Sequence, residues 1–162
     1  MQLFKKYCLL LVMLVMVACQ QRADDSPQRV DELYYAAIRG EKAAFAPLRA
    51  LANKGNADAQ AKVGLLYDLG TPSVPKDKVQ AASWYHKSAE QGEPYAQFFL
   101  GRMYRDGIGV PKDLLISYMW LNLAAAQGNE NVTNTREALE KVMTPAQIAE
   151  GQKMSREWKP KL

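Results

Sequence analysis

Apolar residues recur along most of the chain at the spacing of one face of an α-helix, in successive short segments. Two such segments lie between residues 28 and 54. The second contains Pro47, which we expect to kink or delay its helix because proline lacks a backbone donor. The apolar positions are Val30, Leu33, Tyr34 and Ile38 in the first segment, and Phe45, Leu48 and Leu51 in the second. This pattern predicts a pair of helices near the N-terminus.

Helix boundary signals continue this pairing through the middle of the chain. Asn56 is suited to capping a helix that Gly70 ends, because glycine readily adopts the left-handed backbone of a helix terminus. Asp77 can cap the next helix and Gly92 can close it, while Pro94 suits the first position of a third helix. The spacing therefore predicts a run of helical hairpins.

Residues 56–92 and 93–128 are copies of one unit. The tetrapeptide VPKD occurs at residues 74–77 and again at 110–113. Other matched pairs are Gln60 and Gln97, Gly64 and Gly101, Tyr67 and Tyr104, Gly70 and Gly107, Trp84 and Trp120, Ala89 and Ala125, Gln91 and Gln127, and Gly92 and Gly128. Self-similarity at this spacing predicts a stack of helical repeats.

Gly64 and Gly101 lie in the interior of predicted helices, where glycine costs about 1 kcal/mol relative to alanine. Without a Cβ atom, these positions let a second helix approach closely. Trp84 and Trp120 recur on the second helix of each unit. We expect these two rings to be the side chains that pack against the glycines.

Two further helices are expected after the repeats. The first lies near residues 132–142 and has Leu139 and Val142 as its apolar positions. The second opens with Thr144 as its cap and Gln147 completing a capping box. Its stripe consists of Ile148, Gly151, Ser155 and Trp158. Terminal helices such as these are needed to cover the open end of a repeat array.

The second unit resembles the Sel-1-like repeat, a relative of the tetratricopeptide repeat. The matching positions are Ala96-Gln97, Leu100-Gly101, Tyr104, Gly107-Ile108-Gly109-Val110, Asp113, Trp120 and Ala124 to Gly128. The first unit departs from the pattern at Thr71 to Ser73, where its loop is longer and lacks the second glycine. The resemblance implies an all-α fold, a right-handed solenoid of αα-hairpin repeats with helical caps.

The chain begins with a stretch typical of a secretory leader, in which Lys5 and Lys6 precede an apolar run that ends at Ala18. The run is too short to span a bilayer core of about 30 Å. The letters MVAC at residues 16–19 resemble the lipobox of bacterial lipoproteins, in which the chain is cut before the cysteine and the cysteine carries acyl chains such as palmitate. Met16 stands where that family usually has leucine. Ordinary cleavage after Ala18 is the alternative, although Met16 also fits that cut poorly.

Lipidation at Cys19 predicts a protein of the bacterial cell envelope, since two or more acyl chains give stable membrane anchoring. Gln20 follows the cysteine where aspartate usually signals inner-membrane retention, so we expect the outer membrane, facing the periplasm. Cys8 lies in the leader, so the mature chain has no disulfide. Of the 21 basic residues two lie in the leader, which leaves 19 against 17 acidic residues. So weak a balance gives no support to a nucleic-acid partner.

These signals divide the chain into six segments. They are a signal peptide (1–18), a lipidated N-terminus and tether (19–27), an N-terminal helical cap or partial repeat (28–55), the first repeat (56–92), the second repeat (93–128) and C-terminal capping helices (129–162).

The sequence offers little for catalysis or metal binding. His86 is the one histidine, at a position where the second unit has Asn122, and we interpret it as a solvated helix residue. A zinc site needs several cysteine or histidine ligands, and a serine–histidine–aspartate triad could use only His86. Asp77 and Asp113 are placed as helix caps. We therefore expect no enzyme activity, no cofactor and no bound metal.

The first helix of each unit lines the concave side in tetratricopeptide relatives, which points to a candidate binding stripe. Opposite the repeated core positions, the second unit carries Tyr95, Phe99 and Arg102 at the spacing of one helical stripe, and the first unit carries Asp58, Lys62 and Leu65. Packing does not require residues that differ between units, so we expect Tyr95, Phe99, Arg102, Lys62 and Leu65 to contact a protein partner. Packing of Phe99 against the neighbouring unit is an equally weighted alternative.

The resemblance implies a binding module rather than an enzyme. Members of the Sel-1-like family act mostly as scaffolds in envelope assembly, exopolysaccharide systems, signalling and host contact. Some small lipoproteins of the family are immunity proteins that neutralise lipases delivered by rival bacteria, so a secreted phospholipase effector is one expected partner. The alternative is a cell-wall or β-lactam hydrolase related to cysteine-rich members, whose disulfides this chain lacks.

Overall fold

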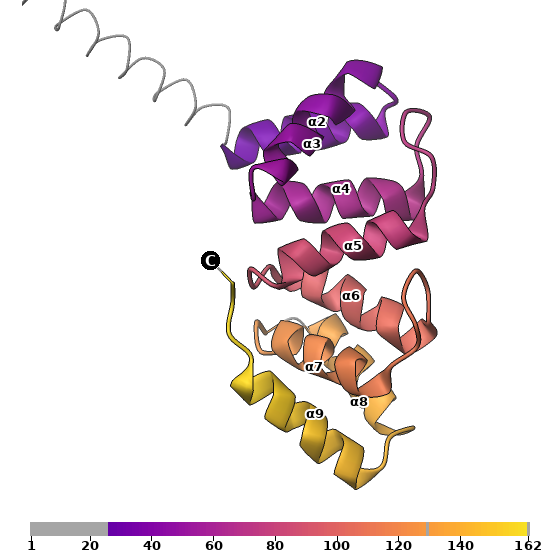
Figure 1. Cartoon of the computed structure of the whole chain (residues 1–162), viewed down its shortest axis with the longest axis vertical. Coiled ribbons are helices and arrows are strands. Elements are labelled where there is room, and N and C mark those ends of the chain that lie inside the picture. Colours follow the sequence, from indigo (N-terminus) through magenta and orange to yellow (C-terminus); the bar gives the residue numbers. More distant parts are fainter. Residues whose placement is uncertain (1–25, 129, 162) are drawn as a thin grey trace, which may run out of the picture.

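A computed structural model shows the chain as a stack of helical hairpins (Figure 1), and it describes residues 26–128 and 130–161. The helices within those residues are α2 (Pro27–Ile38), α3 (Lys42–Asn53), α4 (Ala57–Leu69), α5 (Lys78–Ala89), α6 (Pro94–Asp106), α7 (Leu114–Ala125), α8 (Glu130–Glu140) and α9 (Pro145–Glu157). α2 packs on α3, α4 on α5 and α6 on α7, and both α8 and α9 pack on α7. The predicted all-α stack of hairpins is confirmed.

Side-chain caps set the helix starts, as the sequence predicts. Asn56 accepts a hydrogen bond from an amide in the first turn of α4 at 2.8 Å, and Asp77 accepts two from the first turn of α5, both at 3.0 Å. The capping box between Thr144 and Gln147 forms at the start of α9. Glu93, which the sequence did not mark as a cap, accepts from an amide of α6 at 2.6 Å. Each cap replaces a hydrogen bond that the first turn of a helix lacks.

The two interior glycines admit a neighbouring helix, as expected. A Cβ atom on Gly64 would lie 2.9 Å from the ring of Tyr85, and one on Gly101 would lie 2.8 Å from Cγ of Leu121. Any side chain at these positions would therefore overlap the second helix of the same hairpin. The glycines fix how closely α4 approaches α5 and how closely α6 approaches α7.

The predicted partners of these glycines, Trp84 and Trp120, are wrong by one residue. Successive residues of an α-helix point about 100° apart, so the residue after each tryptophan faces the glycine and the tryptophan does not. Trp84 packs with buried residues of α2, α3 and α4. Trp120 packs with buried residues of α4, α5 and α6. Each tryptophan thus joins its hairpin to the one before it.

The N-terminal hairpin departs from the predicted pattern at two positions. Val30 and Leu33 are buried as expected, but Ile38 is 37% exposed and Ala37 is fully buried instead. Ile38 is the last residue of α2. Pro47 lies inside α3, which begins at Lys42, so the proline does not delay the helix.

The loops inside the two repeat hairpins reach the preceding hairpin in different ways. In the first repeat the Ser73 hydroxyl donates a hydrogen bond to the Gly40 carbonyl at 3.1 Å. In the second repeat Gly109 has a φ of 73°, and a Cβ atom there would come within 2.1 Å of the Lys78 carbonyl oxygen. Both loops lie along the same edge of the stack (Figure 1). Each loop therefore lies close against the hairpin before it.

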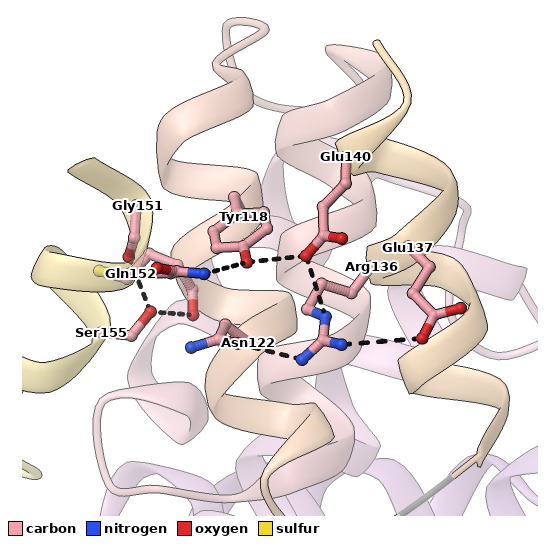
Figure 2. Close-up of polar contacts among 9 residues, drawn as sticks. Tyr118, Asn122, Arg136, Glu137, Glu140, Gly151, Gln152 and Ser155 are labelled. Carbon is pink, nitrogen blue, oxygen red and sulfur yellow. Dashed lines mark hydrogen bonds and ion pairs between the residues drawn. The ribbon is translucent and has the colours of Figure 1, made fainter. Parts of the chain in front are cut away.

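A polar cluster joins α8 and α9 to the second repeat, as Figure 2 shows. The Tyr118 hydroxyl on α7 donates to Glu140 on α8 at 2.8 Å, and the Gln152 amide on α9 reaches the same hydroxyl at 3.5 Å. The Arg136 guanidinium lies between Asn122, at 3.3 Å, and Glu140, at 3.5 Å. Burial and the hydrogen bond to Glu140 raise the pKa of Tyr118, so its hydroxyl remains a donor at neutral pH. The cluster holds the capping helices on the open end of the array.

The last residues that the structure describes return to the middle of the stack (Figure 1). The Trp158 ring meets the Trp120 ring edge-on, with 6.0 Å between centroids. The Lys161 amide donates to the Glu90 carbonyl at 2.7 Å, and its ammonium pairs with the Glu90 carboxylate. These residues, 158–161, are termed the C-terminal strap. The strap joins α9 to the turn between α5 and α6.

Candidate protein-binding face

The stripe predicted to bind a partner lies on the outer side of the first helices of the two repeats. This first-helix face comprises Asp58, Lys62 and Leu65 on α4, and Tyr95, Phe99 and Arg102 on α6. Tyr95 is 44% exposed and Arg102 is exposed, whereas Lys62, Leu65 and Phe99 are half-buried. The α4 residues and Tyr95 line one hollow, while Phe99 and Arg102 line a neighbouring one.

Phe99 contributes both to the surface and to the packing between repeats. One side of its ring stacks on Tyr85 of the preceding repeat, with 5.5 Å between centroids and 16° between planes. The ring centroids of Tyr95 and Phe98 lie 4.5 Å and 5.2 Å from that of Phe99, with larger angles between the ring planes. The predicted alternative, in which Phe99 packs against the neighbouring unit, is therefore observed for the side of the ring that faces Tyr85. The ring is half-buried, so part of its surface remains open to a partner.

Arg102 is held by aromatic rings rather than by a carboxylate. Its guanidinium carbon lies 5.6 Å from the centroid of Phe98 and 5.8 Å from that of Phe99. No ion pair to Arg102 occurs within residues 26–128 and 130–161. Contact with ring faces restricts the side chain and leaves the hydrogen-bonding edges of the guanidinium free. Arg102 is thus preorganised to meet an acceptor group.

Lys62 is engaged within the chain. Its ammonium pairs with Asp31 on α2 at 3.0 Å and with Asp58 one turn earlier on α4. Burial lowers the pKa of Lys62, but the hydrogen bonds and charges of the two carboxylates outweigh burial and raise it. The lysine therefore remains a cation and ties α2 to α4. A partner at this position would meet the whole ion-pair group rather than a free ammonium.

Two hollows flank the exposed edge of Tyr95. The first, termed the tyrosine hollow, has a volume of about 370 Å³, lies between α2, α4 and α6, and is lined by Asp31, Tyr34, Tyr35, Asp58, Glu93 and Tyr95 among others. The second, of about 350 Å³, lies between α6, α7 and α8 and includes Phe98, Phe99 and Val132. Glu93 and Tyr95 line both hollows. These two residues therefore form the ridge between them.

The contribution of α2 to this face was missed from the sequence. Asp31 and Tyr35 lie one turn apart on the side of α2 opposite Val30 and Leu33, and both are exposed. The segment was interpreted as an end cap, so only its buried face was considered. The exposed stripe at i and i+4 is the signal that would have placed α2 beside the binding stripe.

Comparison with known proteins agrees with the repeat structure. The family model described as Sel1 repeat matches residues 57–93 and 94–129. A solved Sel1 repeat protein from Oxalobacter formigenes is 35% identical and superposes with a TM-score of 0.64, over 76% of this chain and 97% of that one. The chain belongs to the Sel1 repeat family. A protective antigen present in uropathogenic Escherichia coli strains, which displays an SLR fold, is 34% identical with a TM-score of 0.67, over 72% of this chain and 25% of that one.

Curated relatives share the Sel1 repeats but are much longer. The ERAD-associated E3 ubiquitin-protein ligase component HRD3A of Arabidopsis thaliana is 38% identical over 65 residues, which are 40% of this chain and 10% of that protein. The chitin synthase regulator SKT5 of Saccharomyces cerevisiae is 38% identical over 77 residues, which are 46% of this chain and 11% of that protein. The chain thus spans about a tenth of these relatives. What is shared is a Sel1-repeat scaffold.

His86 lies on the second helix of the first Sel1 repeat, away from the first-helix face. Its ring is 6.1 Å from that of Trp120, and its Nδ1 atom is 3.7 Å from a carboxylate oxygen of Glu90. Within the described part of the chain, no group of three or more histidine, cysteine or acidic residues is placed to hold a metal ion.

The predicted lipidation site, Cys19, and the leader lie outside the described residues of this Sel1 repeat protein. None of the helices from α2 to α9 is long and apolar enough to cross a bilayer.

Proposed function

We propose that this Sel1 repeat protein is a non-enzymatic adaptor of the bacterial envelope, anchored by lipid on Cys19, which binds a protein partner through the first-helix face. The observation that carries the proposal is the α6 part of the first-helix face, where the exposed Tyr95 ring, the half-buried Phe99 ring and the Arg102 guanidinium, which has no ion pair among the described residues, lie together. Tyrosine and arginine are among the side chains that dominate binding energy at protein interfaces.

Preorganisation strengthens this assignment. Ordering a long side chain on binding costs about 0.5–1.5 kcal/mol, and ring contacts already restrict Arg102 in the free protein. Phe99 is likewise fixed by its stack on Tyr85. A partner would therefore meet a surface that needs little rearrangement.

The matched relatives favour binding over catalysis for the shared repeats. One is named as a component of a ligase and another as a regulator of a synthase. In both cases the repeats matched here make up only part of the protein. An adaptor role for the repeats fits these names.

As the first partner to test, we propose a secreted phospholipase effector, with the chain acting as an immunity protein. This choice rests on the family resemblance and on the predicted envelope location. Cells that express such a lipase in the periplasm should survive when they also express this chain. Survival that is equal with and without the chain would favour a scaffolding role in the envelope.

The test of the face is a double variant, Phe99→Ala with Arg102→Ala, used as bait for affinity capture from envelope fractions or with a purified phospholipase. We expect it to lose the partner that the wild type captures and to melt within a few degrees of wild type. Phe45 and Arg49 on α3 form a matched control, because they are also a ring and a guanidinium, with 6.0 Å between them. Phe45→Ala with Arg49→Ala should keep the partner. Retention of the partner by the first variant, or loss by both, would refute the assigned face.

The anchor has a separate test. Cells fed an alkyne palmitate analogue should label the wild-type chain and not a Cys19→Ser variant. Label on the serine variant, or a wild type without label, would refute lipidation while leaving the binding face untouched.

A further inference from the structure

The tyrosine hollow carries more negative than positive charge. The carboxylates of Asp31, Asp58 and Glu93 line it, and Lys62 is the one cation among its lining residues. Asp31 and Asp58 share that ammonium. Glu93 has no ion pair within the part of the chain that the structure describes. The hollow therefore has an excess of acidic groups, and Glu93 is the carboxylate among them without an ion pair in the described residues.

Glu93 is also in an environment that disfavours its charge. Burial raises the pKa of the Glu93 carboxyl, although hydrogen bonds from the amides of Ala96 and Tyr95 act in the opposite direction. A desolvated carboxylate gains more from a nearby cation than a solvated one does. The capping role of Glu93 at α6 fixes its position on the ridge between the two hollows.

Tyrosine rings complete the lining around these carboxylates. Tyr35 is 57% exposed and Tyr95 is 44% exposed. Tyr34 is half-buried and meets Tyr35 at 5.2 Å between ring centroids. Ring faces attract ammonium and guanidinium groups, and their apolar surface suits the methylene stem that carries such a group. Carboxylates and tyrosine rings together are complementary to a long basic side chain and not to an acidic one.

We propose that the tyrosine hollow receives an arginine or lysine side chain of the protein partner, with Glu93 and Asp58 as its carboxylate contacts and Tyr35 and Tyr95 as its ring contacts. This rests on the proposed function, because the hollow adjoins the ridge of the first-helix face. The ring centroids of Tyr95 and Phe99 are 4.5 Å apart, so the basic side chain binds directly beside the aromatic residues of the first-helix face. A volume of about 370 Å³ has room for a side chain of this length.

The proposal can be tested without knowing the partner. The probes are a short glycine–serine peptide with one arginine at its centre and the same peptide with citrulline, which has nearly the same shape but no charge. Each is titrated into the ¹⁵N-labelled protein and followed by amide chemical shifts. We expect the arginine peptide to give saturable shifts at Asp58 and Tyr95, and the citrulline peptide to bind up to about fivefold more weakly, the upper end of the range for loss of an exposed charge pair.

Variants of the hollow make the test specific. Asp58→Asn should weaken binding of the arginine peptide by up to about fivefold through the lost charge pair, and Tyr95→Ala should weaken it about two- to fivefold through the lost ring contact. Glu93→Gln should also weaken binding of the arginine peptide. If loss of the Glu93 cap destabilises α6, the Asp58 and Tyr95 variants alone test the proposal. Glu150→Gln is the matched control, because Glu150 is an exposed carboxylate on α9 whose side chain is 51% exposed.

The outcomes separate this proposal from the proposed function. Equal binding of the two peptides, shifts that do not saturate, or equal losses in the Glu150→Gln control would overturn the basic-side-chain assignment. Loss of the partner in the Phe99 and Arg102 double variant does not depend on those results. If the arginine peptide fails to bind but the double variant loses the partner, the first-helix face still binds the partner and the tyrosine hollow does not take part.

Discussion

Gln60 and Gln97 occupy matched positions in the two repeats, yet their surroundings differ. Each side-chain amide donates to the carbonyl of the residue eight positions earlier, at 3.0 Å for Gln60 and 3.3 Å for Gln97. Gln91 then donates to the free oxygen of Gln60 at 2.7 Å. The matched Gln127 is exposed, and within the described residues the buried oxygen of Gln97 has no partner. The donation to the backbone repeats, whereas the link between side chains does not.

The position that faces the interior glycine also combines a repeated contact with a side chain that differs between the repeats. Tyr85 fills it in the first repeat and Leu121 fills it in the second, and both are fully buried. The Tyr85 hydroxyl has no hydrogen-bond partner among the described residues, and Leu121 avoids that problem. The comparison teaches that repetition is strict for the glutamine bond to the backbone and for the glycine at the helix crossing. It is loose where one side chain meets another.

The largest expected effect concerns a feature that both repeats share. Gly101→Leu should lower the free energy of unfolding by about 3 kcal/mol or more, because the added side chain overlaps Leu121 and overpacking is poorly tolerated. Arg102→Leu, one residue on and exposed, should stay within about 0.5 kcal/mol of wild type. Denaturant melts of both variants measure the difference. Equal losses would mean that the contact between α6 and α7 does not depend on the glycine.

Placing the loop residue of one repeat into the other repeat should cost more stability at Gly109 than at Ser73. Gly109→Ser should cost about 2 kcal/mol, because serine is strained at this positive φ and its Cβ atom would meet the Lys78 carbonyl. Ser73→Gly should cost about 1 kcal/mol through the lost hydrogen bond to Gly40. Thermal melts would contradict this interpretation if the serine were tolerated at Gly109.

Tyr85→Phe should stabilise the protein by about 1 kcal/mol, since it removes a buried hydroxyl without a partner and keeps the ring. Tyr118→Phe is the matched control. Its hydroxyl donates to Glu140, so its loss should destabilise by about 1 kcal/mol. Opposite signs in the two melts are the expected result. A Tyr85 variant that is no more stable than wild type would show that this hydroxyl is satisfied in solution.

The smallest effect separates the two matched glutamines at the hairpin ends. Gln91→Ala should cost about 1 kcal/mol, because it leaves the oxygen of Gln60 buried and unpaired. Gln127→Ala, at the exposed counterpart, should stay within about 0.5 kcal/mol of wild type. Similar losses at both positions would mean that Gln127 reaches Gln97 in solution.

The sequence predicted the parts of the fold that depend on local backbone chemistry. Asn56, Asp77 and Thr144 cap helices as expected because a cap acts within its own turn. The glycine contacts were anticipated, but their partners were misjudged by one residue. Helix phase decides which of two adjacent side chains faces inward, and both Trp84 and Tyr85 suit a core. That choice depends on where neighbouring helices lie, which a single repeat does not reveal.

The candidate binding face was only partly predictable from the sequence. Variation between matched positions pointed to Tyr95 and Arg102, because exposed stripes are free of the packing that the repeats share. The tyrosine hollow could not be derived in the same way, since it brings Asp31 and Tyr35 of α2 beside Glu93 across three hairpins. Glu93, for which the sequence predicted no role, caps α6 and lines the hollow.

The C-terminal strap sets how far α9 lies from the turn between α5 and α6. One hairpin, α6 with α7, separates α9 from the turn at Glu90 that the strap reaches. Four residues span at most about 14 Å when fully extended, whereas another hairpin would move α9 away by about two helix widths of 8–10 Å each. A second hairpin inserted between that turn and α9 would put Glu90 out of reach of the strap. The strap therefore fixes the separation of α9 from this turn at one hairpin and leaves the rest of the array unconstrained.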